Sequence, residues 1–112
     1  MHKTKIVTSF LKNSEEVLIL KRSEKVKSMK NLWAGISGII EGEEKPIKRA
    51  QIEIYEEVGI KGSDIKLVKE GEKILIESPQ YKNHQWEVYP FLFSCSKREI
   101  KLNWENSDAK WI

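Results

Sequence analysis

Three glutamates, Glu53, Glu56 and Glu57, fall within five consecutive positions of the sequence. On a helix, residues three and four positions apart are neighbours, so these carboxylates would crowd one face and repel one another by roughly 0.2–0.5 kcal/mol per pair. A divalent cation would offset the repulsion, because hard cations take oxygen ligands from carboxylates and backbone carbonyls. The alternative is a solvated acidic helix face, which needs no metal.

The glutamates must be positioned by a helix, and the surrounding residues predict one. Pro46 is typical of the first helical turn, and Gly59 suits a left-handed residue that ends a helix. One apolar stripe recurs at helical spacing, formed by Ile47, Ala50, Ile54 and Val58. We therefore expect a helix from Pro46 to Gly59, with the carboxylates lying off its apolar stripe.

The rest of the chain predicts mainly β-structure. Alternating or continuous apolar runs between turn residues indicate strands at residues 3–11, 16–21, 65–70, 73–77, 85–94 and 100–102. The run VLIL in the second of these is typical of a strand buried on both faces. Gly35 and Gly38 mark places where the backbone turns or approaches another group closely. Strands, one strong helix and further strands indicate an α+β domain with a mixed sheet.

The length and composition favour a single domain over residues 1–112, since 112 residues suit one hydrophobic core. A net charge of +3 is too small a surplus to predict nucleic-acid binding. The single cysteine, Cys95, lies in the apolar run FLFSC and is expected to be a buried thiol, which suits a reducing compartment. Neither a membrane-spanning stretch nor a signal-peptide core is found in the sequence. We therefore predict a cytoplasmic protein without membrane partners.

The glutamates belong to a longer pattern. It runs Gly, five residues, Glu, eight residues, Glu, an aliphatic residue, any residue, Glu-Glu, any residue, Gly and an aliphatic residue, carried here by Gly38, Glu44, Glu53, Ile54, Glu56, Glu57, Gly59 and Ile60. This pattern resembles the signature of the Nudix (MutT-like) hydrolases, which specifies nine positions and is matched at eight of them. The resemblance extends through VLILKRS before the box and WEVYPFLF after it, and so covers most of the chain.

The resemblance implies a fold and a metal site. The fold would be the Nudix fold, a mixed β-sheet with the helix of the box packed against it. Glu53, Glu56 and Glu57, together with the carbonyl of Gly38, would bind Mg²⁺ or Mn²⁺, and Glu44 would be a supporting catalytic residue of the box. Arg22, which precedes the box, would bind substrate phosphate, because its planar guanidinium donates two hydrogen bonds at once.

The resemblance also implies a reaction. The chain would hydrolyse a phosphoanhydride bond in a nucleoside diphosphate linked to another group, a small-molecule substrate. The general base varies within the family, and the candidates here are Glu77, Glu99, Glu105 and His84. Trp33 and Trp86 are expected to pack in or near the core, and base stacking by Trp86 or Tyr81 is an alternative.

One signature position departs from the family. Ile52 stands where the family has an arginine that orients the neighbouring glutamate. Arg49 lies four residues before Glu53, within side-chain reach on a helix, and we hypothesise that it partly substitutes for that arginine. The alternative is a weakly active or inactive Nudix-fold module that binds a nucleotide or sugar phosphate and regulates an attached domain.

The C-terminal residues raise a further expectation. In Nudix domains a tryptophan near the position of Trp111 commonly precedes a final helix, which this sequence lacks. The sequence thus resembles a truncated domain or the N-terminal part of a longer chain with a C-terminal domain. An apolar end without its covering helix would favour a homodimer.

Overall fold

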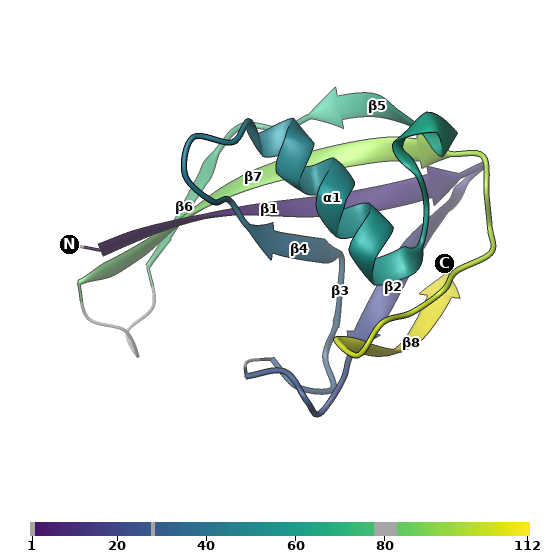
Figure 1. Ribbon diagram of the computed structural model, residues 1–112, viewed down its shortest axis with the longest axis horizontal. Helices are drawn as coiled ribbons and strands as arrows, with labels where there is room; N and C mark the ends of the chain where they lie inside the picture. Colours follow the sequence, from purple (N-terminus) through teal and green to yellow (C-terminus); the bar gives the residue numbers. More distant parts are fainter. Residues whose placement is uncertain (1, 28, 78–82) are drawn as a thin grey trace.

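The computed structural model describes residues 2–27, 29–77 and 83–112. Figure 1 shows one long helix lying across a sheet. The elements are β1 (His2–Asn13), β2 (Glu16–Arg22), β3 (Trp33–Ala34), β4 (Ile36–Ile39), α1 (Pro46–Val58), the 3₁₀ helix η1 (Gly62–Asp64), β5 (Ile65–Glu70), β6 (Ile74–Glu77), β7 (His84–Cys95) and β8 (Asn106–Trp111). The predicted α+β class with a mixed sheet is confirmed, and α1 is the single α-helix among the described residues.

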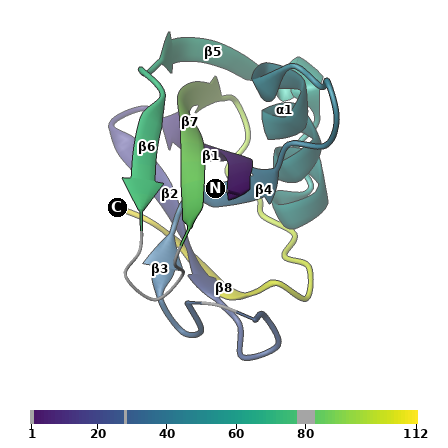
Figure 2. The same cartoon turned by 90° about the vertical axis from the view of Figure 1, so that its left-hand side faces the viewer.

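The sheet is built around two long parallel strands, β1 and β7, which pair from His2 with His84 to Lys12 with Ser94. On the other edge of β1, β4 pairs antiparallel. Both β5 and β6 pair antiparallel with β7, along its second and first halves respectively. A tight turn carries β1 into β2, which pairs with β3 and β8. Figures 1 and 2 show β2, β3 and β8 turned away from the β1–β7 layer.

The core lies between α1 and one face of the sheet. Side chains alternate between the faces of a strand, so Val7 and Leu11 of β1 share a face with Phe91 and Phe93 of β7, and all are buried. The apolar stripe of α1 packs on this face, and Ala50, Ile54 and Val58 are buried in the same cluster. The helical periodicity therefore predicted the correct buried side of α1.

The predicted bounds of the helix are also correct. Pro46 occupies the first turn of α1, where its missing N–H leaves no hydrogen bond unmade. Gly59 follows the last helical residue with φ +76°, a left-handed conformation, and its N–H donates to the carbonyl of Tyr55 at 3.0 Å. None of the helices in the described part of the chain has the length and apolarity that a membrane span requires.

Several predictions of strands were wrong or incomplete. Residues 100–102 form no strand. The N–H of Lys101 donates to the carbonyl of Val58 at the end of α1, and Ile100 and Leu102 pack against the core cluster. The run VLIL is not buried on both faces, since Leu18 and Leu20 are buried while Val17 and Ile19 are half-buried. β8 was missed, because its polar sequence NSDAKW has little strand propensity and forms a strand by pairing with β2.

Two predictions of burial had different outcomes. Cys95 is a buried free thiol, as expected. Trp33 was expected in or near the core, but it is exposed on the short strand β3, where the ammonium of Lys110 lies 4.4 Å from the centre of its ring. Trp86 is half-buried on β7.

Because Ile54 is fully buried between α1 and the sheet, the Ile54→Ala variant should lose about 2–5 kcal/mol of unfolding free energy. The matched control is Ile52→Ala on the exposed side of the same helix, where Ile52 is 37% exposed. Chemical denaturation of the three proteins measures the difference. Equal losses in both variants would contradict the orientation of α1 described above.

Candidate functional site

Glu53 lies between α1 and β4, directly over Gly38. The residue is 8% exposed, and a Cβ added at position 38 would overlap the Cγ and Cδ atoms of Glu53. Gly38 pairs with Val7 of β1, so it faces the helix from an edge strand of the sheet. Only a residue without a side chain lets Glu53 lie this close to the backbone of β4.

Arg49 holds Glu53 in this position and ties it to the start of the helix. Its Nη1 donates to Glu53 Oε2 at 3.0 Å. Its Nη2 and Nε donate to Glu44 Oε2 at 2.8 Å and Oε1 at 3.1 Å, a two-pronged contact that suits the planar guanidinium. Glu41 lies 3.6 Å from the same Nη2. The hydrogen bond with Glu44, followed by that with Glu53, raises the pKa of Arg49.

Glu44 is further fixed by its own loop. The backbone N–H of Glu41 donates to Glu44 Oε1 at 2.7 Å. This bond, reinforced by Arg49, lowers the pKa of Glu44. The residue therefore stays ionised and links the loop before α1 to the arginine that holds Glu53.

Glu57 is the most deeply buried ionisable group of the helix, with 2% of its surface exposed. Its Oε1 accepts a hydrogen bond from Asn106 Nδ2 of β8 at 3.1 Å. Its Oε2 is buried and has no hydrogen-bond partner among the described residues. Burial raises the pKa of Glu57 to about 8, although the Asn106 bond opposes this. The side chain is thus buried, and its second oxygen is free of hydrogen bonds to the described residues and could bind a cation.

Neighbouring charges show which other residues lie near these two glutamates. Burial raises the pKa of Glu53, Arg49 opposes the rise, and the charges of Glu56 and Glu105 add to it. Beyond the effect of burial, Glu105 also raises the pKa of Glu57, while Arg22 lowers it. Arg22 at the end of β2 and Glu105 just before β8 therefore lie close to the buried carboxylates of α1.

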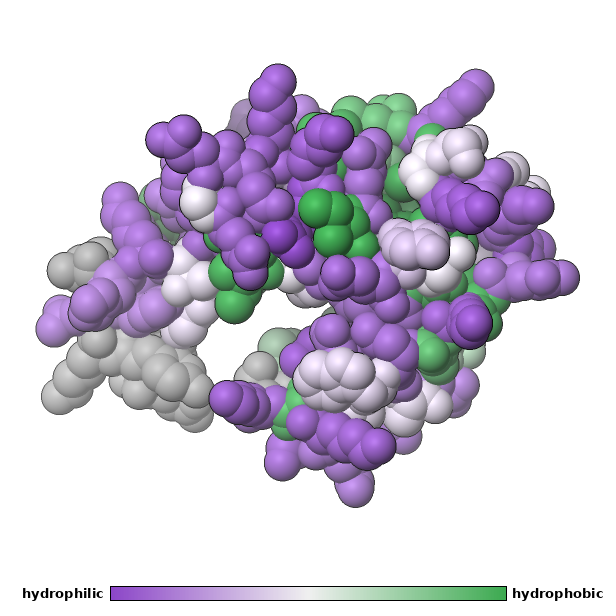
Figure 3. Space-filling model, in the orientation of Figure 1, coloured by the Kyte–Doolittle hydropathy of each residue, from purple (hydrophilic) through white to green (hydrophobic). Residues whose placement is uncertain are grey.

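The three glutamates do not share one environment. Glu56 is exposed, whereas Glu53 and Glu57 are buried beneath contacts from β4 and β8. Figure 3 shows hydrophilic side chains over the α1 side of the molecule and a hollow in this face next to β4. No group of three acidic, histidine or cysteine side chains is gathered as a preformed metal cage in residues 2–27, 29–77 and 83–112.

The donors nevertheless fit a hard divalent cation. Glu53 and Glu57 supply carboxylate oxygens, and Glu57 Oε2 is buried without a hydrogen-bond partner among the described residues. The backbone of Gly38 lies against the side chain of Glu53. Carboxylates and carbonyls of this kind are the ligands that Mg²⁺ takes in proteins.

The four candidates for a general base lie in different places. Glu105 is the one whose charge acts on Glu53 and Glu57. Glu77 is exposed on β6, and Glu99 is exposed in the segment after β7. His84 is hydrogen-bonded to Thr4 Oγ1 at 2.7 Å and lies against Trp86 with ring centres 4.3 Å apart. Tyr81 falls outside the described residues.

Sequence reasoning missed Asn106, the residue that links β8 to Glu57. It is 6% exposed and polar, but an asparagine at the start of an unrecognised strand gives no signal of burial. Glu41 was also missed as part of the Arg49 cluster. Its position three residues before Glu44 was the available signal.

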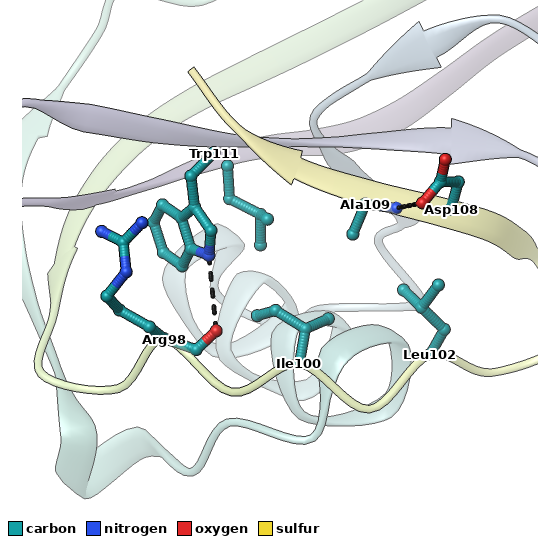
Figure 4. Close-up of a pocket in the computed structure, with 7 residues that line it drawn as sticks. Arg98, Ile100, Leu102, Asp108, Ala109 and Trp111 are labelled. Carbon is teal, nitrogen blue, oxygen red and sulfur yellow. Dashed lines mark hydrogen bonds between the residues drawn. The ribbon is translucent and has the colours of Figure 1, made fainter.

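A separate pocket of about 330 Å³ lies between β8 and the segment after β7. It is lined by Leu18, Arg98, Ile100, Leu102, Asp108, Ala109 and Trp111. Figure 4 shows the guanidinium of Arg98 beside the ring of Trp111, whose Nε1 donates to the Arg98 carbonyl at 3.3 Å. None of the residues of the glutamate box lines this pocket.

The raised pKa of Glu57 predicts a pH-dependent stability in metal-free buffer. Between its ordinary value of 4.5 and about 8 the unfolded chain releases this proton while the folded chain keeps it. Stability should therefore fall as the pH rises through this range. At pH 8 the Glu57→Gln variant should be more stable than the native chain by roughly 1–4 kcal/mol.

Denaturation with a chelator present, from pH 5 to 8, measures this difference. Glu56→Gln, at an exposed position of the same helix, is the matched control. Parallel stability curves for the native chain and Glu57→Gln would contradict the buried, protonated state of Glu57.

Solved structures with the same architecture were found. The MutT protein of Methanosarcina mazei superposes with a TM-score of 0.76 at 20% identity, covering 99% of this chain and 77% of that one. An Ap4A hydrolase of C. elegans gives 0.73 at 19% identity, covering 99% and 79%. The NUDIX domain of Shewanella oneidensis NrtR, solved in complex with ADP ribose, gives 0.74 at 15% identity, covering 99% and 73%. At these identities the likeness shows the fold.

No curated protein matches the sequence. The family comparison is decisive, because the model described as NUDIX domain matches residues 2–112. With the whole of its sheet and its glutamate-bearing helix inside that match, the chain belongs to the NUDIX domain family.

Proposed function

We propose that this chain is a metal-dependent hydrolase that cleaves a phosphoanhydride bond in a nucleoside diphosphate linked to another group. The observation that carries the proposal is Glu57, a buried carboxylate with one unpartnered oxygen, next to a second buried carboxylate held by Arg49. Burying two such groups is costly, and a bound cation would recover that cost. The family supports the same chemistry, as do two of the structural neighbours, a MutT protein and an Ap4A hydrolase.

Mg²⁺ or Mn²⁺ would be held by Glu53, Glu56, Glu57 and the carbonyl of Gly38. When bound, the ion would supply neutralisation of phosphate oxygens and a water of lowered pKa. Glu57 must release its proton to bind a cation, so metal binding at neutral pH should release protons. Glu44 acts through Arg49, keeping the guanidinium in place to orient Glu53.

Two further residues have proposed roles around this centre. Arg22 lies close enough to lower the pKa of Glu57, and its fork can bind a phosphate oxygen pair next to the metal. Among the candidates for a general base, Glu105 is favoured, because its charge acts on both buried carboxylates.

A second candidate function is ligand binding without fast turnover. Ile52 in place of the signature arginine is the observation that favours it. A binding module would keep affinity for a nucleotide or sugar phosphate and would control an attached domain. The NUDIX domain of NrtR, which shares the fold of this chain, was solved in complex with ADP ribose.

Turnover of a panel of substrates tests the proposal. Nucleoside diphosphate sugars, dinucleoside polyphosphates, NADH, ADP-ribose and nucleoside triphosphates should be assayed with Mg²⁺ and then Mn²⁺. At least one should be cleaved, and Glu57→Gln should lower kcat about a hundredfold or more, since it removes a proposed metal ligand. Glu43→Gln, at an exposed position outside the Arg49 cluster, is the control. Binding of panel members without cleavage would favour the second function instead.

The role of Arg49 has its own test. Arg49→Gln should lower Mn²⁺ affinity and kcat by about 10–100-fold, as loss of a residue that orients a metal ligand commonly does. Because positions 49 and 52 are neighbours on the helix, Ile52→Arg in the Arg49→Gln background should restore part of the loss. Mn²⁺ titration followed by electron paramagnetic resonance measures affinity apart from turnover.

The matched control for Arg49 is Lys48→Gln, at the exposed neighbouring position. Unchanged Mn²⁺ affinity in Arg49→Gln would show that Glu53 needs no such support. A loss in Arg49→Gln that Ile52→Arg leaves unaltered would show that Arg49 does not replace the signature arginine.

A further inference from the structure

β6 is an outer strand of the sheet with an unusual surface. Among the described residues it pairs only with β7, and Figure 2 shows it at the side of the sheet, beyond β7. Its three apolar residues are all exposed, Ile74 at 49%, Leu75 at 54% and Ile76 at 46%. An exposed apolar edge strand presents free backbone groups to a further strand.

The sequence of this edge is complementary to itself. In the run Lys73-Ile74-Leu75-Ile76-Glu77, an antiparallel copy centred on Leu75 places Lys73 opposite Glu77 of the second copy. The same register places Ile74 opposite Ile76 and Leu75 opposite itself. Each directly opposed pair is thus of opposite charge or apolar on both sides, the combinations that stabilise neighbouring strands.

The faces of the sheet match in this register as well. Ile74 pairs with Val88, Val88 with Ile6, and Ile6 with Ile39, so an apolar row crosses four strands on the face away from α1. Lys73, Leu75 and Glu77 alternate onto the other face, where Lys73 lies 3.8 Å from Glu87. A two-fold axis through Leu75 would join the sheets of the two copies into one. Each row of side chains would then continue on the same face of the second copy.

From this edge we propose that the chain forms a symmetric homodimer in which β6 pairs antiparallel with β6 of a second copy. The interface is isologous, so each Lys73–Glu77 pair occurs twice. The proposal is independent of the proposed hydrolase activity, because β6 carries none of the residues of the glutamate box.

Charge reversal tests the register. Lys73→Glu would oppose two glutamates and Glu77→Lys two lysines, so each single variant should weaken the dimer roughly tenfold. The double variant should recover it, and so should an equimolar mixture of the two single variants, in which every opposed pair is again complementary. Lys73→Glu also removes the contact between Lys73 and Glu87 and could lower stability. Thermal unfolding of both single variants measures their folded fractions, so a loss of folding is told apart from a loss of association.

Sedimentation velocity from low micromolar to several hundred micromolar protein measures the association. Leu75→Lys should abolish the dimer, whereas Leu67→Lys, at an exposed position on β5 outside the paired register, should not. A native chain that stays monomeric throughout overturns the proposal and leaves β6 for a different partner. A dimer that persists in Leu75→Lys, or a mixture that fails to associate, overturns it by placing the interface elsewhere.

Discussion

The structure depends on the burial of two carboxylates, Glu53 and Glu57, on the sheet side of α1. A buried charge is costly unless it is paired, and each of these glutamates meets the cost differently. Glu53 is held by Arg49 across a glycine that leaves room for it. Glu57 has only the amide of Asn106, and burial raises its pKa to about 8. The loop before α1, β4 and β8 are all arranged around these two side chains.

Arg49 links Glu53 to Glu44 in a chain that has an isoleucine at position 52. An arginine one helical turn before Glu53 contacts it from the side, and its other nitrogens are taken by Glu44. Because the guanidinium is planar and its donors are fixed in space, the carboxylates of Glu44 and Glu53 are oriented relative to each other. The exposed Ile52 takes no part in this cluster.

The two halves of the sheet contribute differently. The α1 side carries the buried carboxylates and the apolar core, so its residues are constrained by both packing and charge. The β6 edge carries exposed apolar side chains between a lysine and a glutamate. Such an edge is unfavourable in water for an isolated chain, and pairing with a second copy would cover it without disturbing α1.

The sequence by itself determined the helix, the glutamate box and the family resemblance. Helix periodicity, Pro46 and Gly59 are local signals, readable within a few residues, and the structure confirms the bounds they predict. Arg49 was also within reach, since a four-residue spacing on a helix is fixed by geometry. Tertiary structure decided the rest. β8 became a strand because β2 lies beside it. Residues 100–102 did not, because the N–H of Lys101 bonds to the end of α1. Glu57 became buried because Asn106 arrives from 49 residues away. Strand pairing and burial are set by contacts between distant parts of the chain, so no local pattern specifies them.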